Sequence, residues 1–214
     1  MLRTLLTLGL IGMVAATLLS GVNLATRDRI ASEQQRQALA TLNQLVPESE
    51  YDNALVEDRF SAWISGLSTP STIYRARIDG EPVALLADVT TPDGYSGDIR
   101  LLVGLRPGGD IIGVRVLEHR ETPGLGDQID LKRSNWIRQF AGKSLGNPPA
   151  QAWAASRRGG DFDTLSSATI TSSAVIEAVQ NVLAWYSSNR DNAFEIQAES
   201  NSNSNSESGD FGNR

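Results

Sequence analysis

The hydrophobic pattern changes along the chain, and its first segment is a long uncharged run. Residues 4–26 are rich in Leu, Ile, Val, Ala and Gly and follow a short N-terminus, Met1-Leu2-Arg3. At about 1.5 Å per residue, such a run crosses the roughly 30 Å hydrocarbon core of a bilayer. A cleaved signal peptide is the alternative, although its apolar region usually has only about 7–15 residues. We therefore expect residues 1–26 to form a transmembrane anchor.

The second segment, residues 27–70, begins with a weak stripe at helical spacing. The stripe is apolar except for Gln34 and comprises Ile30, Ala31, Gln34, Ala38, Leu42 and Leu45. Pro47 cannot continue a helix, so the predicted helix covers residues 27–45. It could be a stalk that sets the height of a following domain, or a first helix packed on the core. We describe 27–70 as a helical stalk or linker.

From residue 71 the pattern alternates with the period of β-strands. Two hairpins are predicted, each with Gly in its turn. Strands 72–78 and 82–90 flank Asp79-Gly80-Glu81, and strands 98–105 and 111–118 flank Pro107-Gly108-Gly109-Asp110. The pattern therefore predicts antiparallel strands.

Helical spacing returns after the strands. A short helix is predicted over 130–140 and a longer one over 173–187, with Thr171 or Ser172 as its N-cap. Strands followed by helices predict an α+β domain over residues 71–197. Residues 198–214 are rich in Ser and Asn, and we expect them to form a disordered tail.

Composition narrows the possible functions. A hydrophobic fraction of 40% can supply a core, and the net charge of −6 argues against a nucleic-acid partner. The sequence has no cysteine and a single histidine, His119. Disulfides, thiolate metal sites and multi-histidine metal sites are therefore excluded within this chain.

Two glycine-containing stretches could approach a flat ligand. Gly94-Tyr95-Ser96-Gly97 places an aromatic residue between glycines just before a predicted strand. The second stretch follows a predicted strand and reads Glu121-Thr122-Pro123-Gly124-Leu125-Gly126. Pro123 fixes φ, whereas Gly124 and Gly126 permit a positive φ. This loop could offer backbone N–H groups and the Thr122 hydroxyl to a polar ring edge, while Glu121 could bind a ring N–H or orient the loop. Ordinary turns are the alternative for both stretches.

A third stretch, Asp163-Thr164-Leu165-Ser166-Ser167-Ala168-Thr169, is small and polar and precedes the long predicted helix. The N-terminus of a helix favours a phosphate through its unpaired N–H groups and its dipole. The small side chains leave room for a phosphodiester. A Ser/Thr-rich helix start without any ligand is the alternative.

Together these stretches resemble the FMN-binding domain family, and within it the G subunits of Rnf (also called Rsx) electron-transport complexes. Gly94–Gly97 looks like the family's Gly-Tyr-x-Gly element, and Glu121–Gly126 looks like its glycine loop. Asp163–Thr169 looks like its flavinylation signature D-x-x-[ST]-G-A-T. The resemblance implies one FMN joined by a phosphoester to Thr169, the last residue of the signature. The cofactor contacts that it implies are Thr169, Ser166, Ser167, Ala168, Asp163, Tyr95, Gly97, Glu121, Thr122, Gly124 and Leu125.

The chain departs from the signature at one position, where Ser167 replaces the usual glycine. If that position requires a positive φ, serine would be strained there and glycine would not.

The resemblance also implies a function. A protein of this kind relays electrons within an ion-translocating complex in the bacterial inner membrane, with its soluble domain on the periplasmic side. Its partners are the other Rnf/Rsx subunits, the membrane and a flavin transferase that attaches the FMN. Two alternatives stay open: a component like the C subunit of a sodium-translocating NADH:quinone reductase, and an anchored binding module without redox function.

Overall fold

The computed structural model describes residue 9, residues 12–13 and residues 33–196. The chain divides into two compact units, Met1–Asn43 and Gln44–Arg214. None of the helices described is both long and apolar enough to span a bilayer. The anchor expected over 4–26 lies, except for three residues, outside the described residues, as does the tail expected over 198–214.

In the first unit, residues 33–42 are helical. The predicted helix extends to Leu45, but Leu45 lies beyond the observed end and belongs to the core of the second unit. A Cβ on Gly113 would lie 2.9 Å from Leu45 Cδ2, and one on Gly104 would lie 3.2 Å from Leu45 Cδ1. The two glycines therefore leave room for the Leu45 side chain.

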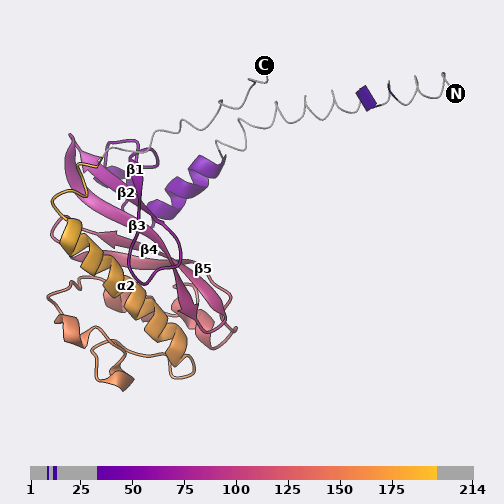
Figure 1. The fold of residues 1–214 in the computed structure, drawn as a ribbon, viewed down its shortest axis with the longest axis vertical. Helices are drawn as coiled ribbons and strands as arrows, with labels where there is room; N and C mark the ends of the chain where they lie inside the picture. The colour runs from indigo at the N-terminus through magenta and orange to yellow at the C-terminus, as the bar shows by residue number, and fades with distance from the viewer. Residues whose placement is uncertain (1–8, 10–11, 14–32, 197–214) are drawn as a thin grey trace, which may run out of the picture. The chain divides into compact units, whose positions relative to one another are not determined.

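The second unit contains a five-stranded antiparallel sheet in the order β1-β2-β3-β4-β5, each strand pairing with its neighbour in sequence (Figure 1). The strands are β1 (Arg59–Ala62), β2 (Ser71–Ile78), β3 (Glu81–Gly94), β4 (Gly97–Leu105) and β5 (Ile111–Glu118). Both predicted hairpins are present. Strand β1 was not predicted; its four residues lie within the segment expected to be a stalk or linker.

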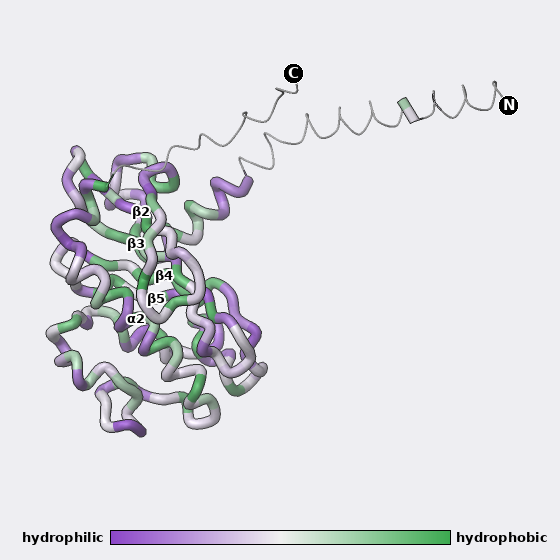
Figure 2. Tube along the Cα trace, in the orientation of Figure 1, coloured by the Kyte–Doolittle hydropathy of each residue, from purple (hydrophilic) through white to green (hydrophobic). Residues whose placement is uncertain are grey.

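Helix α2 (Thr169–Asn189) lies across one face of the sheet, and the core between them is apolar (Figures 1 and 2). From the helix, Val175, Val179 and Val182 are fully buried. This helix begins four residues before the predicted start at Ser173. Ala168 is its N-cap, so neither Thr171 nor Ser172 caps it, and both are buried in its first turn.

Between the sheet and α2 the chain forms four short 3₁₀ helices: η2 (Gly126–Ile129), η3 (Trp136–Phe140), η4 (Ala150–Ala152) and η5 (Ser156–Arg158). A fifth, η1 (Glu48–Glu50), precedes the sheet. The helix predicted over 130–140 is therefore wrong except for its last turn. Side chains compete with the helix there, because the Asp130 carboxylate accepts from Lys132 N and the Ser134 hydroxyl accepts from Trp136 N.

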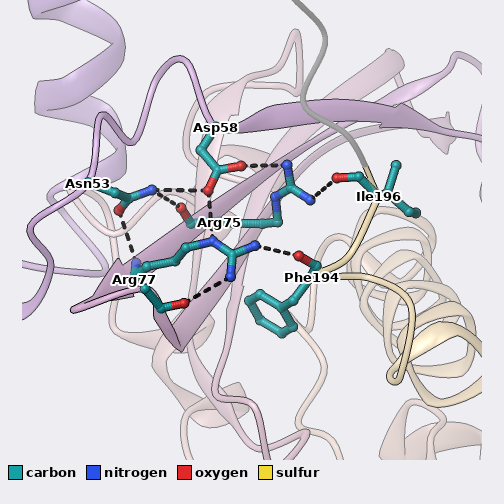
Figure 3. Close-up of polar contacts among 7 residues, drawn as sticks. Asn53, Asp58, Arg75, Arg77, Phe194 and Ile196 are labelled. Atoms are coloured by element: carbon teal, nitrogen blue, oxygen red, sulfur yellow. Dashed lines mark hydrogen bonds and ion pairs between the residues drawn. The ribbon is translucent and has the colours of Figure 1, made fainter.

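The segment after α2 is held to β2 by two arginines (Figure 3). Arg75 and Arg77 both pair with the Asp58 carboxylate, and they donate hydrogen bonds to the main-chain carbonyls of Ile196 and Phe194, respectively. The Arg75 side chain is only 2% exposed. We call these residues the Arg75–Arg77 cluster. It fixes the chain that follows α2 against the sheet.

Candidate functional site

The three stretches singled out in the sequence meet around one cavity of about 420 Å³. Of the predicted site residues, those that line it are Tyr95, Glu121, Thr122, Leu125, Ser166, Ser167, Ala168 and Thr169. Gly126, Ile170 and Thr171 also line it and were not among the predicted contacts. Had the long helix been predicted to begin at Thr169, Ile170 and Thr171 would have been in its first turn and among the expected contacts.

The other three predicted residues do not line the cavity. Gly97 closes the β3–β4 hairpin opposite Gly94, with a positive φ of 113°. Gly124 has a φ of 79° and donates its N–H to Asp127 Oδ1 at 2.8 Å. The main-chain carbonyl of Asp163 accepts a hydrogen bond of 2.7 Å from Trp136 Nε1.

Glu121 connects the three stretches. Its Oε1 accepts a hydrogen bond of 3.0 Å from the main-chain N–H of Ser96, in the Tyr95 turn. Its Oε2 accepts one of 2.6 Å from the Thr171 hydroxyl, in the first turn of α2. The residue is only 5% exposed. Its main-chain N–H donates to His119 Nδ1 at 3.1 Å, which gives the single histidine a structural contact.

Two glycines allow Glu121 to come this close. A Cβ on Gly94 would lie 2.2 Å from the carbonyl oxygen of Gly97 and 2.9 Å from Glu121 Oε1. A Cβ on Gly126 would lie 2.6 Å from Glu121 Oε2. No side chain fits at either position without moving the carboxylate or the backbone.

The glycine loop does not offer its N–H groups as expected. The carbonyl oxygen of Thr122 accepts from the N–H groups of Leu125, Gly126 and Asp127 at 3.1–3.3 Å. Together with the bond from Gly124 to Asp127, this satisfies the N–H groups of residues 124–127 within the loop. The loop therefore presents side chains to the cavity, including that of Leu125 and the Thr122 hydroxyl, while its backbone keeps the shape fixed.

Another wall is the N-terminus of α2, which begins at Thr169. Among the described residues no side chain caps this helix, and its first turn has no acidic residue. The first main-chain helical bond runs from Ser172 N–H to Ala168 O at 3.0 Å. The N–H groups of Thr169, Ile170 and Thr171 precede this bond, and with the helix dipole they favour an anion here.

Ser167 is not strained at this wall. In the part of the chain that the structure describes, Asp79 is the one non-glycine residue with a positive φ, of 51°. The backbone at Ser167 therefore does not require glycine. The residue is exposed and lines the cavity, so its hydroxyl adds a polar group close to Thr169.

Three exposed apolar side chains surround the cavity. Tyr95 is 69% exposed, Ile170 54% and Leu125 43%, and all three line it. Large apolar side chains gathered at a concave site mark a ligand or partner surface. The cavity thus combines apolar flanks suited to a flat ring with a helix N-terminus suited to a phosphate, a set of groups that fits FMN.

Comparisons with known proteins identify two families that match parts of this chain. Residues 94–184 match the model of the FMN-binding domain family, and residues 1–45 match that of the RnfG N-terminal region. A Shewanella baltica protein, named as the G subunit of an ion-translocating oxidoreductase complex, is 38% identical over 199 residues. The alignment covers 92% of this chain and 94% of the relative.

Two further relatives have the same name. The Pseudomonas aeruginosa protein is 42% identical over 194 residues, covering 89% of this chain and 91% of the relative. The Vibrio parahaemolyticus protein is 39% identical over 188 residues, covering 87% and 89%, respectively.

Proposed function

The chain belongs to the family of G subunits of ion-translocating oxidoreductase complexes, and from this premise we propose that it is a membrane-anchored protein with one FMN attached covalently to Thr169. The observation that carries the proposal is the cavity in which the Tyr95 turn, the glycine loop and the first turn of α2 meet. FMN accepts and releases one or two electrons, so a protein holding it can relay electrons within a larger complex.

Attachment at Thr169 makes one bond and breaks another. The Thr169 oxygen bonds to the FMN phosphorus while a phosphoanhydride bond in an activated flavin nucleotide, such as a flavin dinucleotide, breaks. The mononucleotide leaving group takes the electron pair of that bond, and the hydroxyl proton passes to a base of the transferase. Thr169 is the first residue of α2, so the first-turn N–H groups and the helix dipole stabilise the phosphate charge there.

The remaining cavity residues have distinct roles in this proposal. Tyr95, Leu125 and Ile170 would flank the ring and exclude water from it. Ser166, Ser167 and Thr122 would supply hydroxyl groups at the polar edges of the cofactor. The internal hydrogen bonds of the loop that starts at Thr122 would hold its wall in shape around the cofactor.

We further propose that residues 4–26 anchor the chain in the bacterial inner membrane as a single span, with the domain on the periplasmic side. Its partners would be the other Rnf subunits and a flavin transferase. A covalent link prevents loss of the cofactor, and a shared membrane raises the effective concentration of redox partners. A periplasmic reporter fused after Ala198 should be active. Activity of only a cytoplasmic reporter would reverse the orientation.

Two alternatives make different predictions. A component like the C subunit of a sodium-translocating NADH:quinone reductase would also hold FMN. The alignment with 94% of an Rnf-type relative favours the Rnf-type assignment over that component. An anchored binding module without redox function would leave the cavity free of flavin.

Denaturing electrophoresis separates the flavoprotein from the last alternative. The full chain is expressed together with a flavin transferase, denatured and viewed under ultraviolet light. We expect a fluorescent band at the mass of the chain, because only a covalent flavin survives denaturation. A dark band beside a fluorescent control flavoprotein from the same cells would contradict covalent attachment.

A further inference from the structure

Among the described residues, no basic side chain pairs with the buried carboxylate of Glu121. The residue is 5% exposed, and its hydrogen-bond donors are the Ser96 N–H and the Thr171 hydroxyl, both neutral. Burying a carboxylate in this way is costly unless its hydrogen bonds are well formed. Those bonds join the Tyr95 turn, the glycine loop and α2, so the carboxylate holds together three walls of the cavity.

The contact with Thr171 determines how α2 is rotated. Thr171 is fully buried and lies two positions after Thr169. At 3.6 residues per turn, these two side chains are about 200° apart around the helix axis. Holding the Thr171 hydroxyl against the glycine loop therefore sets the direction in which the Thr169 side chain leaves the helix.

We propose that Glu121 and Thr171 form a positioning pair for flavin attachment: Glu121 acts through the Thr171 hydroxyl and the Ser96 N–H to present Thr169. This inference rests on the proposed attachment at Thr169. It assigns Glu121 the role of orienting the loop and the helix. Each of its carboxylate oxygens already has a partner within the protein.

The test uses the full chain in detergent micelles with purified flavin transferase and a flavin dinucleotide. We compare the initial rate of labelling for the wild type, Thr171→Val and Thr171→Ser. Valine has nearly the shape of threonine but has no hydroxyl. We expect labelling of Thr171→Val to be about tenfold slower, which is the order expected from losing one hydrogen bond to a charged group. Thr171→Ser restores the hydroxyl and should label at a rate within about twofold of the wild type.

A double-mutant cycle tests whether Glu121 acts through Thr171 or independently of it. If the pair acts as a unit, Glu121→Gln combined with Thr171→Val should be no slower than the slower single variant. The label should still form on Thr169, and the fluorescence spectrum of the labelled Thr171→Val protein should differ from that of the wild type. Ser188→Ala removes a hydroxyl from the exposed far end of α2 and serves as the control, with an unchanged rate.

Several outcomes would overturn the inference. If the wild type is labelled and Thr171→Val has the same labelling rate and the same spectrum as the wild type, the positioning pair is rejected. The proposed attachment site is not affected by that result. If Thr171→Ser is labelled as slowly as Thr171→Val, the positioning pair is also rejected, because restoring the hydroxyl would not restore the labelling rate. A wild type that takes up no label rejects the proposed function itself. If circular dichroism shows that Thr171→Val does not fold, the same comparison is made between Thr171→Ala and Thr171→Ser.

Discussion

The Thr171 hydroxyl donates a hydrogen bond of 2.6 Å to Glu121 Oε2, across 50 residues of sequence. The glycine loop and the first turn of α2 are held together by this contact. Gly126 lies beside it, with room for a hydrogen atom but not for a methyl group. The contact between the glycine loop and α2 therefore depends on this buried hydrogen bond and on the absence of a side chain at Gly126.

The first prediction concerns Gly126. In Gly126→Ala the new Cβ would lie 2.6 Å from Glu121 Oε2, so the loop or the carboxylate must shift. We expect a loss of about 1–3 kcal/mol in the free energy of unfolding, measured in urea, and slower labelling of Thr169. Gly146→Ala is the matched control, because its Cβ meets no atom within 4 Å. Equal losses for both variants would contradict the close packing around Glu121.

The second prediction concerns Ser167, where the signature usually has glycine. Since the backbone here has no positive φ, glycine relieves no strain. We expect Ser167→Gly to label no faster than the wild type and to lose up to about 1 kcal/mol of stability, because glycine adds freedom to the unfolded chain. Ser166→Gly provides the neighbouring control. A clear rise in labelling rate confined to Ser167→Gly would show that the serine is unfavourable for the transferase.

Tyr95 is the subject of the third prediction. Its side chain is 69% exposed and lines the cavity, so Tyr95→Ala should change the free energy of unfolding by no more than about 0.5 kcal/mol. The emission of the labelled protein should nevertheless shift toward that of free FMN, since an aromatic flank of the ring is lost. Trp63→Ala removes an aromatic side chain of similar exposure that does not line the cavity, and its emission should match that of the wild type.

The fourth prediction separates the stability of the domain from the site. Asp58→Asn leaves the buried Arg75 without its anionic partner, so we expect a loss of about 3–5 kcal/mol by urea unfolding. Labelling below the unfolding transition should be unchanged, because none of these residues lines the cavity. Arg158→Ala breaks an exposed ion pair with Glu177 and should cost about 0–1 kcal/mol. Similar losses for the two variants would contradict a structural role for the Arg75–Arg77 cluster.

Local patterns in the sequence predicted the two hairpins, and the three motifs contain most of the residues that line the cavity. Alternating apolar positions and glycine turns sufficed for β2 to β5, and the motifs indicated the family, which the comparisons confirm. The four-residue β1 is too short to display alternation. Its place in the sheet depends on pairing with β2, in which Phe60 lies opposite Ile73.

The remaining differences come from tertiary contacts between distant residues. The first turn of α2, rich in Thr and Ser, has low helix propensity, but Glu121 holds Thr171 and Leu165 N donates to the Ser172 hydroxyl. Arg75 looks like a polar position on an exposed strand face, yet Asp58 and the carbonyl of Ile196 allow its burial. No local pattern in the sequence predicts these contacts.

The central claim is that Thr169 is the residue that holds FMN, and peptide mass spectrometry tests it most directly. The full chain, labelled by the transferase, is digested, and the modified residue in the 163–173 segment is located by fragmentation. We predict a mass increase corresponding to phosphoester-linked FMN on Thr169, and no increase in Thr169→Ala. FMN found on Thr171 or Ser166, or no modified peptide from a fully fluorescent protein, would contradict the assignment.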